Sequence, residues 1–186
     1  LSRNHFVGLQ LGEQTLLRLG RLSLPFGVRV PEHVLWVREA TRTDRESDQQ
    51  HGLAFAHADG RLRFELMAIF GNFQIYPDKY RERGYSAAAE YLLSERIALG
   101  LSSLVTRTNE DRFTQAQRAV RQAHGVTGRV GFAPELALLA ELDLLKEAGR
   151  STGYTGLAQL DYEPLRGLHF IGTLELRGYE WKLTSL

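Results

Sequence analysis

The amino-acid sequence predicts an all-β fold, an antiparallel up-and-down transmembrane β-barrel with about ten strands along this chain. Three observations predict it. Segments in which apolar and polar residues alternate recur throughout, and a period of two is typical of a strand, whose successive side chains leave opposite faces. Short turns and longer polar connections follow one another in regular alternation. No apolar run reaches the roughly 18 residues of a transmembrane helix, whereas a transmembrane strand needs only about 9–11.

Composition narrows the class of protein. The 186 residues suffice for one domain, and we expect a single β-barrel domain over residues 1–186. A formal net charge of +1 with scattered arginines gives no case for nucleic-acid binding. The sequence contains no cysteine, which excludes thiol catalysis, thiolate metal sites and a disulfide framework. A mean hydropathy of −0.27 is compatible with a membrane, because only one face of each barrel strand meets lipid.

The chain is organised as a series of alternating segments joined by turns. The expected strands cover residues 6–11, 15–24, 52–58, 61–70, 85–93, 97–106, 123–132, 136–145, 154–162 and 168–177. In the first of them, Val7, Leu9 and Leu11 share one side. The second strand is less regular, and we expect a bulge near Gly20. A long polar connection over 25–50 then leads to the third strand.

The dipeptide Asp59-Gly60 is the strongest turn signal, since both central residues of a type I′ hairpin turn need a positive φ. Pairing across a two-residue turn puts Phe55 against Phe64 and Leu53 against Leu66. The apolar sides of the two strands then coincide, which favours a hairpin with one apolar face.

Two segments of the second half also fit helices. Residues 134–149 begin with a proline, contain good helix formers and end at a glycine, and residues 86–100 have a similar composition. A helix within 114–123 is a further alternative. Strands are favoured for the first two segments, because Glu141 and Asp143 continue a strict alternation. Helices there would also leave the flanking strands without partners.

The last hairpin shows the two-faced pattern most clearly. Residues 154–162 and 168–177 alternate on either side of a break at 163–167. Pairing Tyr162 with Leu168 places the apolar residues of both strands on one face. The opposite face carries Asp161, His169, Glu175 and Arg177.

The connections decide between a soluble sheet and a membrane barrel. Short turns fall at 12–14, 59–60, 94–96, 133–135 and 163–167, and longer connections fall between them at 25–50, 71–84, 107–122 and 146–153. Outer-membrane barrels show this alternation, with tight periplasmic turns and long extracellular loops. Aromatic residues also gather near strand ends, as in the aromatic girdles of such barrels. We therefore expect the strands to cross a bacterial outer membrane.

Three segments carry a resemblance to a known family. They are RLGRLSLPFGVRVPEH (18–33), GLAFAHADGRLRFELM (52–67) and ELALLAELDLL (135–145). The first resembles the strand-and-loop pattern GR…LPFG…R of porin-like outer-membrane β-barrel proteins of Gram-negative bacteria. The other two are similar to further strands of such proteins. The resemblance implies an antiparallel barrel in the outer membrane, and it carries over no catalytic residues.

The direction of the strands adds an expectation about the chain ends. If the short turns face the periplasm, the strand at 6–11 begins on the outside and the strand at 168–177 ends there. Both termini of a single-chain barrel normally lie in the periplasm. The sequence also begins at Leu1, without an initiator Met or a signal peptide. We therefore expect a piece that is incomplete at both ends, from a barrel of about twelve or more strands.

The polar sides of the strands supply candidates for a lumen. Inward-facing charges would set the selectivity of a pore, contact a partner or fill the interior with salt bridges. The lumen-facing candidates are Arg63, Glu65, Glu90, Arg129, Glu141, Asp143, Gln159, Asp161, His169, Glu175 and Arg177.

Catalytic chemistry has little support in the sequence. Asp161 opposite His169, with Glu175 nearby, would suit acid–base catalysis. Ser102 or Ser103 would complete a Ser/His/acid triad, but no spacing supports one. The histidines follow no metal-binding motif. We expect no enzymatic activity, no metal and no cofactor.

Three functions remain as expectations. The favoured one is a porin-like channel or a structural barrel component of an envelope complex, with outer-membrane lipid around it and a small solute or an envelope protein as partner. The second is a barrel that sheaths or docks a partner such as an electron-transfer cytochrome. The third is a soluble β or α+β binding domain whose apolar faces pack on each other.

Overall fold

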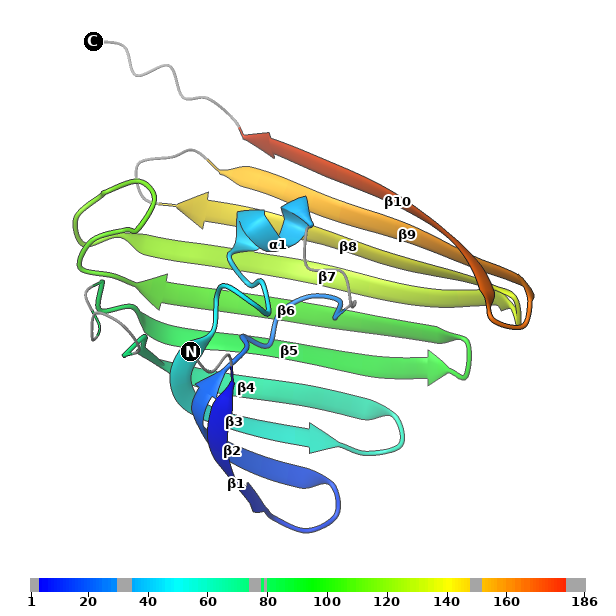
Figure 1. The fold of residues 1–186 in the computed structure, drawn as a ribbon, viewed down its shortest axis with the longest axis horizontal. Coiled ribbons are helices and arrows are strands. Elements are labelled where there is room, and N and C mark those ends of the chain that lie inside the picture. Colours follow the sequence, from blue (N-terminus) through cyan, green and yellow to red (C-terminus); the bar gives the residue numbers. More distant parts are fainter. Residues whose placement is uncertain (1–3, 30–34, 74–77, 79, 148–151, 180–186) are drawn as a thin grey trace.

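Figure 1 shows the protein as one curled antiparallel sheet with a segment lying across one of its faces. The structure, a computed structural model, describes residues 4–29, 35–73, 78, 80–147 and 152–179. The strands are β1 (His5–Gln10), β2 (Thr15–Leu22), β3 (Gln50–Ala58), β4 (Leu62–Gly71), β5 (Arg83–Ser94), β6 (Ile97–Arg107), β7 (Val120–Ala133), β8 (Leu136–Glu147), β9 (Gly153–Leu165) and β10 (Leu168–Tyr179). In the described ranges the only helix is α1, Trp36–Thr41.

The ten strands follow one another in chain order, and each runs antiparallel to its neighbours. This confirms the all-β, up-and-down arrangement predicted from the sequence. Residues 86–100 belong to the β5–β6 hairpin and residues 136–147 form β8, so both segments with helical composition are strands. Residues 114–123 form no helix either, and β7 begins within them at Val120. Tertiary pairing overrides the helix propensity of these segments.

The sheet separates two kinds of side chain. On β8, Glu141 is 4 % exposed and Asp143 is fully buried, whereas Leu142 and Leu144 are 50 % and 58 % exposed. Charged groups are thus buried on one face, the inner face, and large apolar side chains are exposed on the opposite, outer face. A soluble antiparallel sheet normally buries its apolar face and exposes its polar one. The outer face of this sheet therefore exposes apolar side chains that no described part of the chain covers.

The inner face is covered by the connection between β2 and β3. Its described part, residues 23–29 and 35–49, is called the inner segment, and in Figure 1 it lies across the sheet. Within it, α1 packs against β8, β9 and β10. The main apolar cluster comprises Leu22, Leu24, Phe26, Ala40, Ala54, Met67, Ile69, Leu104, Ala123 and Leu145. The connection predicted as a polar loop is therefore part of the core, because its apolar side chains bury an apolar row of the inner face.

The β3–β4 hairpin differs in register from the predicted one. Phe55 pairs with Leu66 rather than with Phe64, because the loop between the paired residues Ala58 and Arg63 is longer than two residues. In this loop the Asp59 carboxylate accepts backbone N–H groups at 2.8 and 2.6 Å. Neither residue of the Asp-Gly pair has a positive φ, so the turn is not type I′. The shift of two residues preserves which side chains share a face.

The β9–β10 hairpin shows the same kind of correction. Tyr162 pairs with Phe170 rather than with Leu168, because β9 continues through Pro164 to Leu165 and the ladder is irregular directly after Leu168. Again the shift is even, so the face on which each side chain lies is the predicted one.

β1 and β10 are the edge strands of the described sheet. Within the described residues β1 pairs with β2 alone and β10 with β9 alone. Each edge carries a row of backbone N–H and C=O groups directed away from the sheet. No described helix is long and apolar enough to span a membrane.

Candidate functional site

The inner face carries the side chains predicted for a lumen. Directly paired residues of neighbouring strands share a face, and the registers join Arg63, Glu90, Glu141 and Glu175 in one row. The adjacent row on the same face contains Glu65, Asp143 and Arg177. Nearer the short turns lie Arg129, Gln159, Asp161 and His169. The structure therefore brings the predicted residues to one face but spreads them along the strands.

Arg38 of α1 is the centre of the contact between the inner segment and the sheet. Its buried guanidinium forms an ion pair with Glu141 on β8. Further N–H groups donate to the carbonyls of Phe26 and Val28 at 3.5 and 3.1 Å and to Thr43 Oγ1 at 3.3 Å. Glu141 also accepts the backbone N–H of Val28 at 2.8 Å. Both buried charges are thus held by several partners, as charges removed from water must be.

Gly27 allows the inner segment to approach this ion pair closely. Its φ of 60° lies in the left-handed region that favours glycine. A Cβ atom at this position would overlap Glu141 and the Arg38 guanidinium. The backbone N–H of Gly27 donates to Ser102 Oγ at 2.8 Å, so an inward-facing serine of β6 anchors the segment here.

Arg42 bridges two carboxylates at the end of α1. Its guanidinium lies 2.7 Å from Asp111 Oδ2 and 2.9 Å from Glu147 Oε1, and it covers the ring of Phe113 at 4.4 Å. Burial opposes the ionisation of Asp111, but Arg42 and the backbone N–H groups of Thr114 and Phe113 outweigh it. They hold the pKa of the Asp111 carboxyl well below its usual range. The β6–β7 connection is thereby tied to α1.

Arg121 on β7 joins the inner segment to the β4–β5 connection. Its guanidinium donates to the Thr41 carbonyl at 2.6 Å and to Glu82 Oε1 at 2.7 Å. Burial opposes the ionisation of Glu82, but the charge and hydrogen bond of Arg121, with Thr106 and Arg42, outweigh it and lower the pKa of Glu82. Three arginines therefore tie the inner segment to the sheet and to its long connections.

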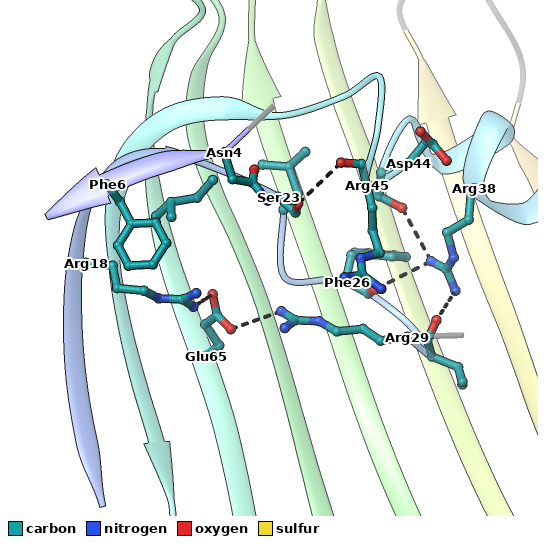
Figure 2. A pocket seen from close by; sticks show the side chains of 14 residues that line it. Asn4, Phe6, Arg18, Ser23, Phe26, Arg29, Arg38, Asp44, Arg45 and Glu65 are labelled. Atoms are coloured by element: carbon teal, nitrogen blue, oxygen red, sulfur yellow. Dashed lines mark hydrogen bonds and ion pairs between the residues drawn. The ribbon is translucent and has the colours of Figure 1, made fainter. Parts of the chain in front are cut away.

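A cavity of about 210 Å³ lies beside this contact (Figure 2). Its lining comprises Asn4, Phe6, Arg18, Leu22, Ser23, Leu24, Phe26, Val28, Arg29, Arg38, Thr43, Asp44, Arg45 and Glu65. In Figure 2, Arg18 and Arg29 point from opposite sides toward Glu65, at 2.5 and 3.0 Å from its two oxygens. Arg18 also lies over the Phe6 ring, 5.7 Å from its centroid. The cavity thus combines guanidinium groups with apolar walls.

Of the three residues considered for acid–base chemistry, the structure brings two together and leaves the third apart. Asp161 and His169 lie 3.0 Å apart in the β9–β10 hairpin. Glu175, in contrast, accepts the N–H of Val37 at 3.1 Å, in the contact with α1. Among the residues that the structure describes, no group of three or more His, Cys, Asp or Glu could hold a metal ion.

The two serines considered for a triad face opposite sides of the sheet. Ser102 binds the inner segment, whereas Ser103 Oγ lies on the outer face, 3.0 Å from His124 Nδ1 and 3.1 Å from the Tyr85 hydroxyl. In the described part of the chain no carboxylate contacts His124. The group that orients the imidazole in a Ser/His/acid triad is therefore missing from this contact.

Comparisons with protein-family models, with curated proteins and with solved structures give no match for this chain. The resemblance to porin-like barrels stays an expectation that rests on residues 18–33, 52–67 and 135–145.

Sequence reasoning missed the inner segment as part of the site. Arg38 and Arg42 lie in a connection that has neither a strand period nor a helix period over its length. Two apolar triplets in this mainly polar connection could have indicated that it is buried. They are Leu24-Pro25-Phe26 and Leu35-Trp36-Val37. Apolar triplets of this kind indicate packing somewhere, but they do not indicate against which strands.

Proposed function

We propose that this chain forms the wall of a bacterial outer-membrane β-barrel, with the inner segment narrowing its lumen, and that it gives small solutes a porin-like passage across the membrane. The single observation that carries the proposal is the outer face. Large apolar side chains are exposed there on every strand from β1 to β10. A contiguous apolar surface of this extent needs a nonaqueous partner.

One row of paired residues shows how continuous the apolar outer face is. Across β4 to β10 it consists of Phe64, Ala89, Leu101, Val126, Leu142, Gly156 and Leu176. Every member is apolar, and Leu101 and Leu142 are exposed. Lipid acyl chains are the partner that matches such a surface over its full width.

Strand length supports the same proposal. β5 to β10 have lengths of 12, 11, 14, 12, 13 and 12 residues. A tilted strand needs about 9–11 residues to cross the hydrocarbon core. These strands are therefore long enough to span a bilayer and extend beyond it. Because an unpaired strand edge is not tolerated in lipid, the proposal includes pairing of the outer edges of β1 and β10.

The inner segment supports a narrowed lumen. Its irregular backbone is hydrogen-bonded by inward-facing groups such as Ser102 and Glu175. Irregular backbone at membrane depth is tolerated only where protein or a water-filled cavity surrounds it. The charged inner face would then influence which solutes pass.

A structural barrel component of an envelope complex is the second candidate, and the apolar cluster under the inner segment favours it. Phe26, Leu104 and Leu145 belong to this buried cluster, so part of the inner face is dry. A barrel held closed by such packing would insert into a membrane without conducting.

Reconstitution of the complete protein separates these functions. We expect a heat-modifiable band on a gel after detergent extraction and stepwise conductance in planar bilayers. Insertion confirmed by protease protection, with a bilayer that stays sealed, would favour the structural component over the channel. A protein that remains monomeric and soluble without detergent, and does not enter vesicles, would contradict both.

A further inference from the structure

The cavity beside β2 and β4 has an excess of positive charge. Its lining contains Arg18, Arg29, Arg38 and Arg45 but only two carboxylates, Asp44 and Glu65. Arg38 forms an ion pair with Glu141, which is not part of the lining. It also donates hydrogen bonds to the carbonyls of Phe26 and Val28. The charge that remains available to a ligand comes from the other arginines.

Arg18 and Arg29 share a single partner. Both guanidiniums contact the carboxylate of Glu65, one at each oxygen. The Nε of Arg18 is buried and makes no hydrogen bond among the described residues. The Arg29 side chain is half exposed, so it can turn toward a ligand without breaking the core. Two cations around one carboxylate leave an excess positive charge at this end of the cavity, which an anionic ligand would neutralise.

The uncharged part of the lining is mixed, with five apolar side chains beside the polar Asn4, Ser23 and Thr43. Phe6 lies on one side, over Arg18, and Leu22, Leu24, Phe26 and Val28 complete the wall. In Figure 2 the Phe6 ring and the Arg18 and Glu65 side chains lie together at one end of the cavity, with Phe26 and Arg38 at the other. An anion with an apolar body would bury its surface against these apolar side chains, a contribution that phosphate lacks.

The volume limits the size of this ligand. The cavity measures about 210 Å³. An apolar cavity of about 150 Å³ is known to accommodate benzene, so this one has room for a six-membered ring with a single carboxylate. Larger or multiply charged molecules would not fit without moving the inner segment.

We propose that this cavity binds a small apolar monocarboxylate of the size of benzoate, with its carboxylate between Arg18 and Arg29 and its ring directed toward Phe26. The carboxylate would accept charge-assisted hydrogen bonds from the guanidinium groups of Arg18 and Arg29. This inference does not depend on insertion of the sheet into a membrane, because every contact lies between the inner segment and the inner face.

Isothermal titration calorimetry on the complete folded protein tests the proposal, with benzoate as probe and benzamide as its neutral control. We expect saturable benzoate binding at pH 7 and at least about tenfold weaker binding of benzamide, since one charge-assisted pair typically contributes that much. Absence of saturable benzoate binding would overturn the proposal. Equal binding of benzoate and benzamide would overturn it as well.

Variants locate the site. Arg29→Gln, at a half-exposed side chain, and Arg18→Gln are each expected to weaken benzoate binding about tenfold. Arg96→Gln, in the β5–β6 turn, removes the same charge away from the cavity and is expected to leave the dissociation constant unchanged. Glu65→Gln removes the competing carboxylate and is expected to tighten binding. Unchanged binding in Arg29→Gln, or weaker binding in Glu65→Gln with the fold intact by circular dichroism, would overturn the assignment.

Discussion

Arg38 and Glu141, which lie 103 positions apart in the chain, form an ion pair in which both side chains are almost fully buried. The pair joins α1 of the inner segment to β8 of the sheet. Because both charges have left water, each depends on the other and on the surrounding hydrogen bonds. This contact explains why a connection of mixed composition takes a fixed place on the inner face.

Removal of one partner is expected to destabilise the fold strongly. Arg38→Met leaves the Glu141 carboxylate buried with the N–H of Val28 as its donor, and loss of one partner of a buried pair typically costs about 3–5 kcal/mol. Equilibrium unfolding in urea measures the change. The control is Glu90→Gln, because the Glu90–Arg129 pair is partly exposed and such pairs contribute about 0–1 kcal/mol. Equal losses in the two variants would contradict the role of the buried pair.

The pH dependence of stability is expected to include a contribution from Asp111. Its pKa is lowered in the folded protein, so ionised Asp111 stabilises the fold above the pKa of an unfolded aspartate, about 4. That contribution disappears as the pH falls through the folded pKa. Asp111→Asn is therefore expected to be less stable than the unmodified protein at pH 7, with the difference shrinking below about pH 4. A difference that is independent of pH, measured by urea unfolding across this range, would rule out the ionic contribution.

Gly84 is expected to tolerate no side chain. Its φ is 154°, and a Cβ atom there would overlap the carbonyl oxygen of Val105 on β6. Gly84→Ala is expected to cost at least about 2 kcal/mol, by forcing β5 and β6 apart. Gly172→Ala on β10 meets no atom within 4 Å and is expected to change stability by less than about 0.5 kcal/mol. Thermal or urea unfolding of the two variants gives the comparison, and similar stabilities would count against the close approach.

If the sheet is part of a channel, as proposed, the inner segment is expected to limit its conductance. Arg38→Met loosens the attachment of α1 to β8, so we expect more frequent or larger openings in planar bilayers than for the unmodified protein. Glu90→Gln, which changes an inner-face charge outside the inner segment, tests whether any loss of charge has this effect. Openings altered by the control alone would mean that the inner segment does not control passage.

The strands could be predicted because each has one apolar and one polar side. Leu142 and Leu144 alternate with Glu141 and Asp143, and no helix can place these two sets on opposite faces. The hairpin registers were harder to predict from the sequence. At Asp59 the side chain closes a longer turn than the dipeptide rule predicts, and both hairpins with a predicted register shift by an even number of residues. Face assignments survive an even shift, whereas pairings do not.

The inner segment could not be predicted, because its place depends on contacts distant in the sequence. Arg38 pairs with Glu141, and Arg42 pairs with Asp111 and Glu147, each at least 69 positions away in the sequence. Local periodicity carries no information about such partners. Alternation could therefore show that the candidate residues share one face of the sheet, while their partners and the cavity at Arg18 were missed.

Contact of the outer face with lipid is the central claim, and a cysteine scan of β10 in vesicles tests it most directly. The chain has no native cysteine, so a fluorophore can be placed at position 170, 171, 173 or 174 alone. All four side chains are exposed, but Phe170 and Leu174 lie on the outer face and Ile171 and Thr173 on the inner face. Quenching by brominated lipid is predicted at 170 and 174 and not at 171 and 173. Equal quenching at all four positions, or none at 170 and 174, would contradict a lipid-facing outer surface.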